Sequence, residues 1–271
     1  MQESHRLDLQ FVFEIVEPFT PLVILYGARG SGKTMTWIRL TRYLVTQGYM
    51  VIPDPIFRPS SDKKYREQCE NFGKFCYGDY APCDIDYMLL KVMDRNGRFV
   101  CQVLELPGEF YFDPDNFHEN SEMSPALERL MNLRNPKIWI FMLELDVWNY
   151  ETRIKYVEKI DHILHRRRIA DAILTCPKID MHQELFTRHN VPEIPKLFKR
   201  LKDQYPGIFS LFLNRNPFTR FFKKYTCTLV PFSAGDFYQM EDGRLAYIQG
   251  RDIYPKLLCK AIIKAIRHAQ R

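Results

Sequence analysis

The stretch Gly27-Ala28-Arg29-Gly30-Ser31-Gly32-Lys33-Thr34 decides the fold, because it reads G-x-x-x-x-G-K-T, the pattern of a phosphate-binding loop. The apolar run 21–26 precedes it as a buried strand would, and residues 35–46 follow it with helical character. The strand, the loop and the helix that the pattern requires are therefore all present. This arrangement predicts a nucleoside triphosphate as the ligand.

The residues of this loop suit the binding of phosphate. Its glycines let successive backbone N–H groups curl round the α- and β-phosphates, and Lys33 reaches the β and γ oxygens. The Thr34 hydroxyl is placed to ligate Mg²⁺. The helix that opens at Lys33 adds the positive end of its dipole. We therefore assign nucleotide contacts to Gly27, Ala28, Arg29, Gly30, Ser31, Gly32, Lys33 and Thr34, and a metal contact to Thr34.

The composition is that of a globular protein with a mild excess of basic residues. Of its 271 residues, 46% are hydrophobic, which is ample for a buried core. The net charge of +6 is concentrated in residues 166–168, 196–202 and 215–224. Such clusters more often form a solvated face than a binding site, so we do not expect nucleic acid as a partner.

The cysteines indicate a reducing compartment. The seven cysteines include no C-x-x-C pair, which fits free thiols in a cytoplasmic protein. Cys69, Cys76 and Cys83 recur every seven residues, so a zinc site is an alternative, but the intervals exceed the usual two to four. No apolar run is long enough to cross a membrane, and the N-terminus lacks a secretory pattern. We expect a cytoplasmic protein with no integral membrane segment.

Apolar runs alternate with amphipathic stretches along the chain, which predicts an α/β fold with a mostly parallel sheet. The Asn96-Gly97 pair predicts a tight antiparallel hairpin between two of the strands. We expect one domain over residues 1–271, with insertions at about 54–86 and 181–224. The first insertion is polar and reads as irregular. The expected strands are 7–15, as an added edge, then 21–26, 49–52, 87–93, 99–105, 137–143, 170–176 and 226–232; the expected helices are 35–46, 124–134, 151–167, 194–204 and 252–268.

Three further loops follow expected strands in a familiar order. They are Glu105-Leu106-Pro107-Gly108, Pro177-Lys178-Ile179-Asp180 and Ser233-Ala234-Gly235. With the phosphate loop they resemble, over nearly the whole chain, the small-GTPase-like branch of the P-loop GTPases, the translation-factor-related (TRAFAC) class, and most of all its divergent bacterial members. The loops are similar to D-x-x-G with Glu for Asp, N-K-x-D with Pro for Asn, and S-A-x. The resemblance implies a three-layer, Ras-like P-loop NTPase fold with helices on both faces of the sheet.

This resemblance also implies a guanine nucleotide, GTP or GDP, as the ligand. Asp180 would accept two hydrogen bonds from the guanine N1–H and exocyclic amine, a contact that adenine cannot reproduce. The Lys178 stem would lie against the purine, and the Ala234 N–H, in the same loop as Ser233, would meet guanine O6. In the alternative interpretation, Lys178 and Asp180 are ordinary charges after a strand.

The D-x-x-G-like loop would act at the phosphates. Glu105 would hold the Mg²⁺ shell through water, and Gly108 would offer its N–H to the γ-phosphate. Glu109 stands where small GTPases have the Gln that orients the attacking water, so it would either repel the γ-phosphate or act as a base. Arg29 replaces a glycine of many small GTPases and would contact phosphate or obstruct the water. The catalytic assignments are therefore Lys33, Glu109 and Arg29.

The pattern departs further from the class in the switch I region. No threonine occurs between Thr46 and Thr152, so the switch I Thr is absent and Ser60 or Ser61 would have to substitute. We therefore expect a molecular switch whose hydrolysis of GTP is slow or depends on a protein effector or activator.

Two alternatives stay open. One is a MinD-type or signal-recognition-type ATPase or GTPase, in which the strand after the first helix is parallel and ends in Asp, as 49–54 does; strand direction decides. The other is a nucleotide-binding scaffold with little hydrolysis, whose segments 110–121 and 181–224 form partner surfaces. Five phenylalanines of the second segment would be exposed anchors for a partner, or would instead lie in the core. They are Phe209, Phe212, Phe218, Phe221 and Phe222.

Overall fold

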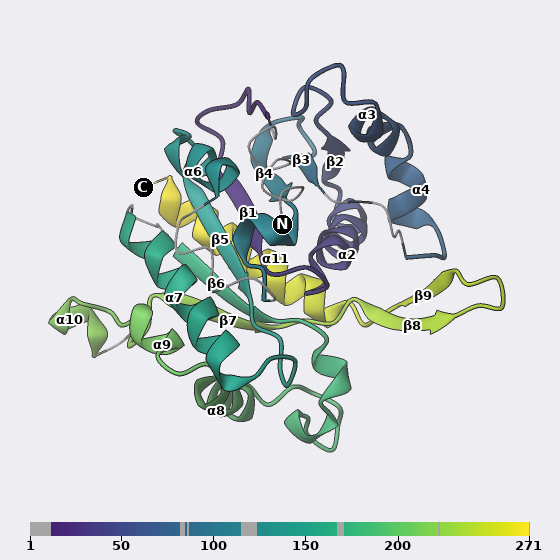
Figure 1. Ribbon diagram of the computed structural model, residues 1–271. Coiled ribbons are helices and arrows are strands. Elements are labelled where there is room, and N and C mark those ends of the chain that lie inside the picture. The colour runs from purple at the N-terminus through teal and green to yellow at the C-terminus, as the bar shows by residue number, and fades with distance from the viewer. Residues whose placement is uncertain are drawn as a thin grey trace.

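The computed structural model describes residues 12–81, 85, 87–114, 124–166, 171–221 and 223–270. Within them, seven strands form one sheet in the order β2-β3-β4-β1-β5-β6-β7 (Figure 1). The strands are β1 Leu22–Tyr26, β2 Met50–Pro53, β3 Met88–Met93, β4 Phe99–Glu105, β5 Lys137–Met142, β6 Asp171–Cys176 and β7 Cys227–Pro231.

The sheet is parallel except at β3. Strand β1 pairs in parallel with β4 and β5, and β6 and β7 continue the parallel part. Strand β3 runs antiparallel to both of its neighbours, β2 and β4. The predicted hairpin turn lies between β3 and β4, where Gly97 has a φ of 74°. The mostly parallel sheet with antiparallel pairing around β3 confirms the predicted fold class.

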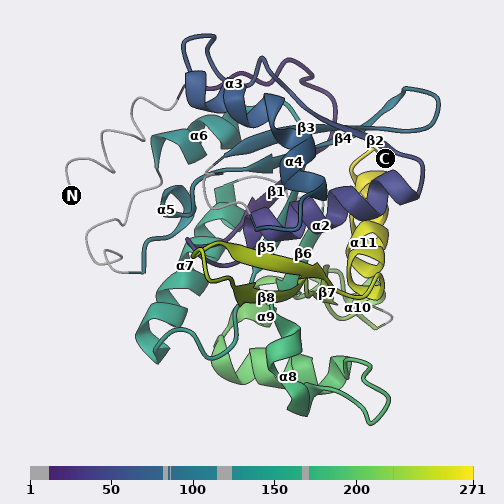
Figure 2. The same cartoon turned by 90° about the vertical axis from the view of Figure 1, so that its right-hand side faces the viewer.

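Helices cover both faces of this sheet, which completes the three layers. Helices α2 (Lys33–Thr46) and α11 (Ile253–Ala269) lie on one face, and α6 (Pro125–Asn132) and α7 (Tyr150–Arg166) lie on the other (Figure 2). The remaining helices are α3 Lys63–Glu70, α4 Phe72–Tyr77, α5 Gly108–Tyr111, α8 Ile194–Gln204, α9 Ile208–Leu211 and α10 Pro217–Arg220, with 3₁₀ turns η1 Ile179–Met181 and η2 Gln183–Leu185.

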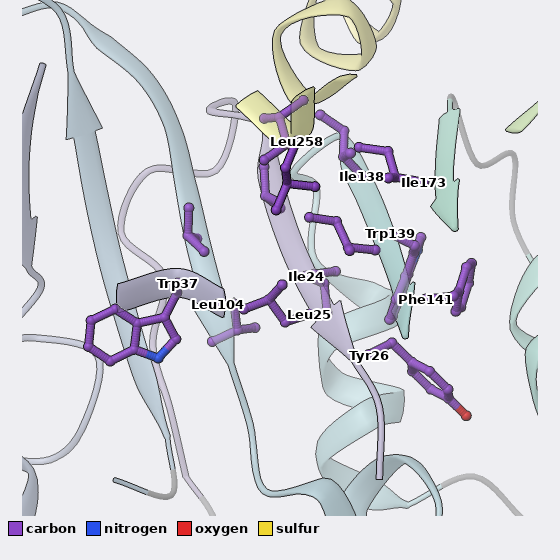
Figure 3. Close-up of a cluster of buried hydrophobic side chains, with 14 of the residues drawn as sticks. Ile24, Leu25, Tyr26, Trp37, Leu104, Ile138, Trp139, Phe141, Ile173 and Leu258 are labelled. Carbon is purple, nitrogen blue, oxygen red and sulfur yellow. The ribbon is translucent and has the colours of Figure 1, made fainter. Parts of the chain in front are cut away.

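The core sits on the central strands. All five residues of β1 are buried, as expected for a strand covered by helices on both faces. Trp37 of α2 and Leu258 of α11 reach these strands from the helices (Figure 3). The Trp139 and Phe141 rings stack at 5.9 Å. This packing fixes β1 and α2, and with them the loop that joins the two.

The prediction of an N-terminal edge strand over residues 7–15 is wrong for the part of it that the structure describes. Residues 12–20 form no strand, and residues 1–11 lie outside the described residues. The Phe13 ring packs on Phe57 at 5.6 Å, and the Glu14 N–H donates to the Phe57 carbonyl at 3.0 Å. The segment therefore attaches to the turn after β2, which itself occupies the sheet edge.

The described part of the segment 58–86 is more regular than expected. Two short helices, α3 and α4, follow β2, and Asp62 caps α3 by accepting a hydrogen bond from the Tyr65 N–H at 3.0 Å. Helix α4 packs against α2 through the stacked rings of Trp37 and Phe72, whose centroids are 5.8 Å apart.

A second sheet extends from the body after β7. It is a hairpin of β8 (Gly235–Gln239) and β9 (Leu245–Gln249), visible at the right of Figure 1, and the sequence interpretation missed it. Most of the β8 side chains are exposed, so the hairpin lacks the buried alternation that marks a strand in sequence. Ala246 of β9 also bridges to Tyr80, which joins the hairpin to the segment before β3.

Two further observations bear on the sequence predictions. No helix among the described residues is long and apolar enough to cross a membrane. Both edge strands of the seven-stranded sheet end in proline, Pro53 in β2 and Pro231 in β7.

Candidate nucleotide site

The phosphate loop leaves β1 at Tyr26 and enters α2 at Lys33. Gly30 and Gly32 have φ values of 77° and 87°, a left-handed backbone that glycine adopts without strain. The Lys33 ammonium donates to the carbonyls of Gly27 and Ala28, each at 3.0 Å. The loop therefore curves back around its own lysine, and two loop carbonyls contact the Lys33 ammonium.

Burial and charge act in opposite directions on this lysine. Burial lowers the pKa of Lys33, while the nearby carboxylates of Glu105, Glu109 and Glu144 raise it. The charges of three acidic side chains therefore act on this buried ammonium. The site has oxygen donors available for a cation as well as N–H donors for an anion.

Glu105, at the end of β4, lies against the first turn of α2. The Thr34 hydroxyl donates to its Oε1 at 2.7 Å, and the Trp37 indole N–H donates to its Oε2. Glu105 is buried. A hydroxyl and a carboxylate are the hard oxygen donors that Mg²⁺ prefers, so these two residues fit that ion.

Gly108 touches the phosphate loop directly. A Cβ at this position would lie 2.2 Å from the Arg29 nitrogen and 2.5 Å from the Ala28 carbonyl carbon, so only glycine fits. The next residue, Glu109, forms an ion pair with Arg29 at 3.6 Å, and the two side chains are 36% and 86% exposed. Two of the three residues to which we assigned roles in hydrolysis, Arg29 and Glu109, therefore lie together at the rim of the loop.

Lys178 ties the loop after β6 to the phosphate loop. Its ammonium donates to the Gly30 carbonyl at 2.9 Å and to Glu144 Oε1 at 2.6 Å. Its backbone is left-handed, with a φ of 54°. Glu144 is buried and follows β5, and the sequence interpretation did not identify it. The signal that was available is a carboxylate placed just after a buried strand, at the carboxyl end of the sheet.

Asp180 lies in the 3₁₀ turn η1, half-buried, two residues after this anchored lysine. The Ile179 N–H donates to the Phe232 carbonyl at 3.1 Å, so the Asp180 loop and the Ser233–Ala234 loop run side by side. Ser233 is buried, and the Ala234 carbonyl accepts from Tyr247 Oη at 2.8 Å. Both loops that we expect around the base are thus at the same edge of the sheet.

A second acidic residue after β5 connects this edge to the insertion. Asp146 has a φ of 59° and receives two hydrogen bonds from Arg200 of α8, each at 2.9 Å. The Arg200 guanidinium holds the pKa of Asp146 below its ordinary value. Sequence reasoning missed this pair, since its partners are 54 positions apart.

The segment just before β3 is held by α2 and the hairpin. Arg42 donates to the Gly78 carbonyl at 2.7 Å, and the Ala81 N–H donates to the Leu245 carbonyl at 2.8 Å. Ser60 and Ser61 lie in the exposed turn before α3. Residues 82–84 and 86 lie outside the described residues, so the replacement for the switch I threonine stays a prediction.

The cysteine alternative gains no support. Among the described residues, no group of three His, Cys, Asp or Glu side chains forms a metal-binding cluster. Burial raises the pKa of Cys69 to about 11 and that of Cys76 to about 12, so both are thiols at neutral pH. Cys83 lies outside the described residues.

The topology and the loop at residues 27–34 define a three-layer P-loop α/β protein. No known family profile matches the chain. The 54 kDa signal recognition particle proteins of Pyrobaculum islandicum and Pyrobaculum arsenaticum are 40% and 38% identical to it over 60 residues. That segment is 21% of this chain and 14% of either relative.

Similar solved structures include proteins bound to GDP or GTP, and their identity to this chain is low. GDP-bound aIF5B from Aeropyrum pernix has a TM-score of 0.39 and 15% identity, with 93% of this chain and 37% of that one covered. The receptor complex SRb-GTP/SRX from Chaetomium thermophilum has a TM-score of 0.39 and 16% identity, with coverages of 80% and 92%. Sup35 complexed with GDP has a TM-score of 0.33 and 12% identity, with coverages of 83% and 41%.

Proposed function

We propose that this chain is a guanine-nucleotide-binding switch, which binds GTP with Mg²⁺ and hydrolyses it slowly or with a partner. The observation that carries the proposal is the meeting of three loops on the phosphate loop. Glu105 bonds Thr34, Gly108 packs on Arg29, and Lys178 bonds Gly30. Ligands of open α/β sheets bind outside the carboxyl ends of the strands, which is where these loops lie.

The phosphates would be held by the chain's own donors. Lys33 would exchange its two carbonyl partners for β and γ oxygens, and the loop N–H groups would surround the α- and β-phosphates. Thr34 and Glu105 would hold Mg²⁺, which neutralises charge on the phosphates when bound. The close approach of the Gly108 backbone to Arg29 supports a role for the Gly108 N–H in detecting a γ-phosphate.

The ion pair of Arg29 and Glu109 explains why hydrolysis would be slow. While the guanidinium contacts Glu109, neither side chain is committed to the phosphate or the attacking water. Exposed pairs of this kind contribute only about 0–1 kcal/mol, so a partner protein can separate them. An activator that binds Glu109 would release Arg29 toward the γ-phosphate.

Asp180 and Ala234 would select guanine. Asp180 lies two residues after a lysine that is fixed to Gly30, which supports a position for its carboxylate beside the nucleotide. A buried acceptor left without its N–H partners costs several kcal/mol, which gives guanine over adenine a preference of roughly 100-fold or more. Pro177, which stands in place of the Asn of the usual motif, has neither a side-chain amide nor a backbone N–H to donate to the nucleotide.

One antiparallel pair of strands favours the small-GTPase-like branch over the signal-recognition-type alternative. Strand β3 runs antiparallel to β4, the strand that leads into the Glu105 loop, and this antiparallel pair is the one expected of the small-GTPase-like branch. Strand β2 runs antiparallel to β3 and so points the same way as β4 and β1, which agrees with the alternative. The 60-residue similarity to signal recognition particle proteins also keeps the alternative in consideration.

The test is the affinity for GTP, GDP and ATP of the wild type, of Asp180→Ala and of Asp203→Ala. Asp203 is an exposed aspartate of α8 and serves as the matched control. We expect Asp180→Ala alone to lose the preference for GTP over ATP, and an unchanged preference contradicts the assignment of the base. Multiple-turnover phosphate release, with and without candidate activators, separates a GTPase from a scaffold with little hydrolysis.

A further inference from the structure

The loop 214–224 carries the two most exposed large apolar side chains of the described residues. Phe218 and Phe221 are 84% and 88% exposed, whereas Phe209 and Phe212, from the same insertion, are buried. Phe222 lies outside the described residues. Solvent exposure of two neighbouring phenylalanines is unfavourable, so this loop is a candidate contact surface.

The loop is built to hold these phenylalanines outward. Its base is closed by a bridge between Leu213 and Tyr225, and the Asn214 N–H donates to the Lys224 carbonyl at 3.0 Å. Helix α10 begins beside Asn216, whose side chain accepts from the Phe218 N–H at 3.0 Å. Phe218 lies in α10, and Phe221 directly follows the end of this helix, three residues later. Figure 1 shows α10 at the outer limit of the molecule, away from α2.

The charge around the phenylalanines has one sign. Arg215, Arg220, Lys223 and Lys224 flank them, and residues 204–235 contain no Asp or Glu. Arg215, Arg220 and Lys224 are exposed, and none of the four forms an ion pair with a described residue. The loop thus combines an apolar tip with uncompensated positive charge.

From this combination we infer that the loop 214–224 docks the protein on an anionic lipid surface. Phe218 and Phe221 enter the boundary between headgroups and acyl chains, and the arginines and lysines contact the acidic headgroups. Such peripheral binding needs two weak signals together, apolar insertion and basic charge, and this loop supplies both. A convex tip of one helical turn suits a membrane better than a nucleic acid strand, which binds along a groove.

Docking in this way leaves the nucleotide site free. Strand β7 runs parallel to β6, β5 and β1, so the loop that precedes it lies toward the amino ends of the strands. The phosphate loop follows the carboxyl end of β1. The lipid surface and the nucleotide site are therefore at opposite ends of the sheet, and lipid binding does not depend on the proposed function.

The experiment is flotation of the full chain with phosphatidylcholine vesicles, with and without phosphatidylserine. We expect wild-type protein to float only with phosphatidylserine. The affinity of the variant Phe218→Ser/Phe221→Ser for these vesicles should be lower than that of wild type by about tenfold or more. The variant Arg215→Gln/Arg220→Gln/Lys224→Gln should lose affinity for these vesicles by about fivefold for each charge removed.

The matched control is Lys256→Gln/Lys260→Gln/Lys264→Gln, which removes the same charge from the exposed face of α11. We expect it to bind as wild type does. Equal losses in both charge variants, binding to neutral vesicles alone, or no binding at all overturn the inference. Release of the protein from vesicles by a single-stranded oligonucleotide would identify nucleic acid as the partner instead.

A second measurement does not depend on the stability of the variants. Tryptophan at position 218, introduced by Phe218→Trp, should show a blue shift in the difference spectrum against wild type when phosphatidylserine vesicles are added. Phe19→Trp, at another exposed phenylalanine, is the control and should show no shift. A shift at both positions or at neither counts against insertion of this loop.

Discussion

The Thr34 hydroxyl and the Glu105 carboxylate lie 2.7 Å apart, joining the first turn of α2 to the end of β4. The second carboxylate oxygen accepts from Trp37, so Glu105 is held on both sides. Glutamate is one methylene longer than the aspartate of the D-x-x-G motif. The Glu105 side chain still reaches the Thr34 hydroxyl, which would ligate Mg²⁺.

Replacing the Glu105 carboxylate should weaken the Mg²⁺-dependent part of GTP binding and leave the Mg²⁺-independent part almost unchanged. Glu105→Gln keeps the shape and the hydrogen-bond acceptor but removes the charge, so Mg²⁺-dependent affinity for GTP should fall by about 10–100-fold. Affinity in the presence of EDTA should hardly change. Titration with a fluorescent GTP analogue measures both, and Glu105→Asp, which restores a carboxylate, is the control. Equal losses with and without Mg²⁺ would rule out the metal role.

Contact between Gly108 and the phosphate loop predicts a sensitive position. A methyl group added by Gly108→Ala meets the Arg29 nitrogen at 2.2 Å, so the backbone must move. We expect a loss of about 1–3 kcal/mol in the free energy of unfolding, measured by urea denaturation. Gly73→Ala in α4 is the control, because nothing lies within 4 Å of its added carbon and alanine favours a helix. Equal effects of the two substitutions would contradict the close contact.

Lys178 should matter for stability even without nucleotide. Lys178→Met leaves the buried Glu144 without its partner, and we expect destabilisation of about 1–3 kcal/mol. The double variant with Glu144→Gln removes the unpaired charge and should recover part of that loss. A double-mutant cycle from urea denaturation gives the coupling energy, and additive effects would show that the pair contributes nothing.

The pair of Asp146 and Arg200 predicts a pH dependence. Since the pKa of Asp146 is lowered in the folded state, its contribution is present above the ordinary value of 3.8 and is lost as the pH falls below it. Wild type should therefore unfold at a higher temperature than Asp146→Asn at pH 7, and the difference should shrink toward pH 3. Arg200→Gln should behave like Asp146→Asn. A difference independent of pH would contradict this assignment.

Much of the fold follows from the sequence because its strands are buried on both faces. The run that became β1 is continuously apolar, as are residues 138–142 of β5, and short apolar runs of this kind fit strands that are covered on both faces. Helices α3 and α4 were missed because both are short and α3 is polar, and because α4 packs on Trp37 through Phe72, which is a tertiary contact. The N-terminal alternation around Phe13 was misleading, because its apolar residues pack on the turn at Phe57.

The candidate site was predictable to the extent that single loops carry it. Lys33, Thr34, Glu105 and Lys178 were assigned from short motifs, and the structure gathers them at one edge of the sheet. Glu144 and Asp146 could not be found that way, since each is defined by a partner distant in the chain. A contact between side chains that are far apart in the chain produces no periodic pattern in the local sequence.

Proline as the last residue of both β2 and β7 limits growth of the sheet beyond its own seven strands. Edge strands expose unpaired N–H and C=O groups that can recruit strands from other molecules, and a proline lacks the N–H that continued pairing would use. Strand β2 has only four residues, which leaves little length for a template. The molecule therefore carries, at each flank of its sheet, a built-in deterrent to aggregation.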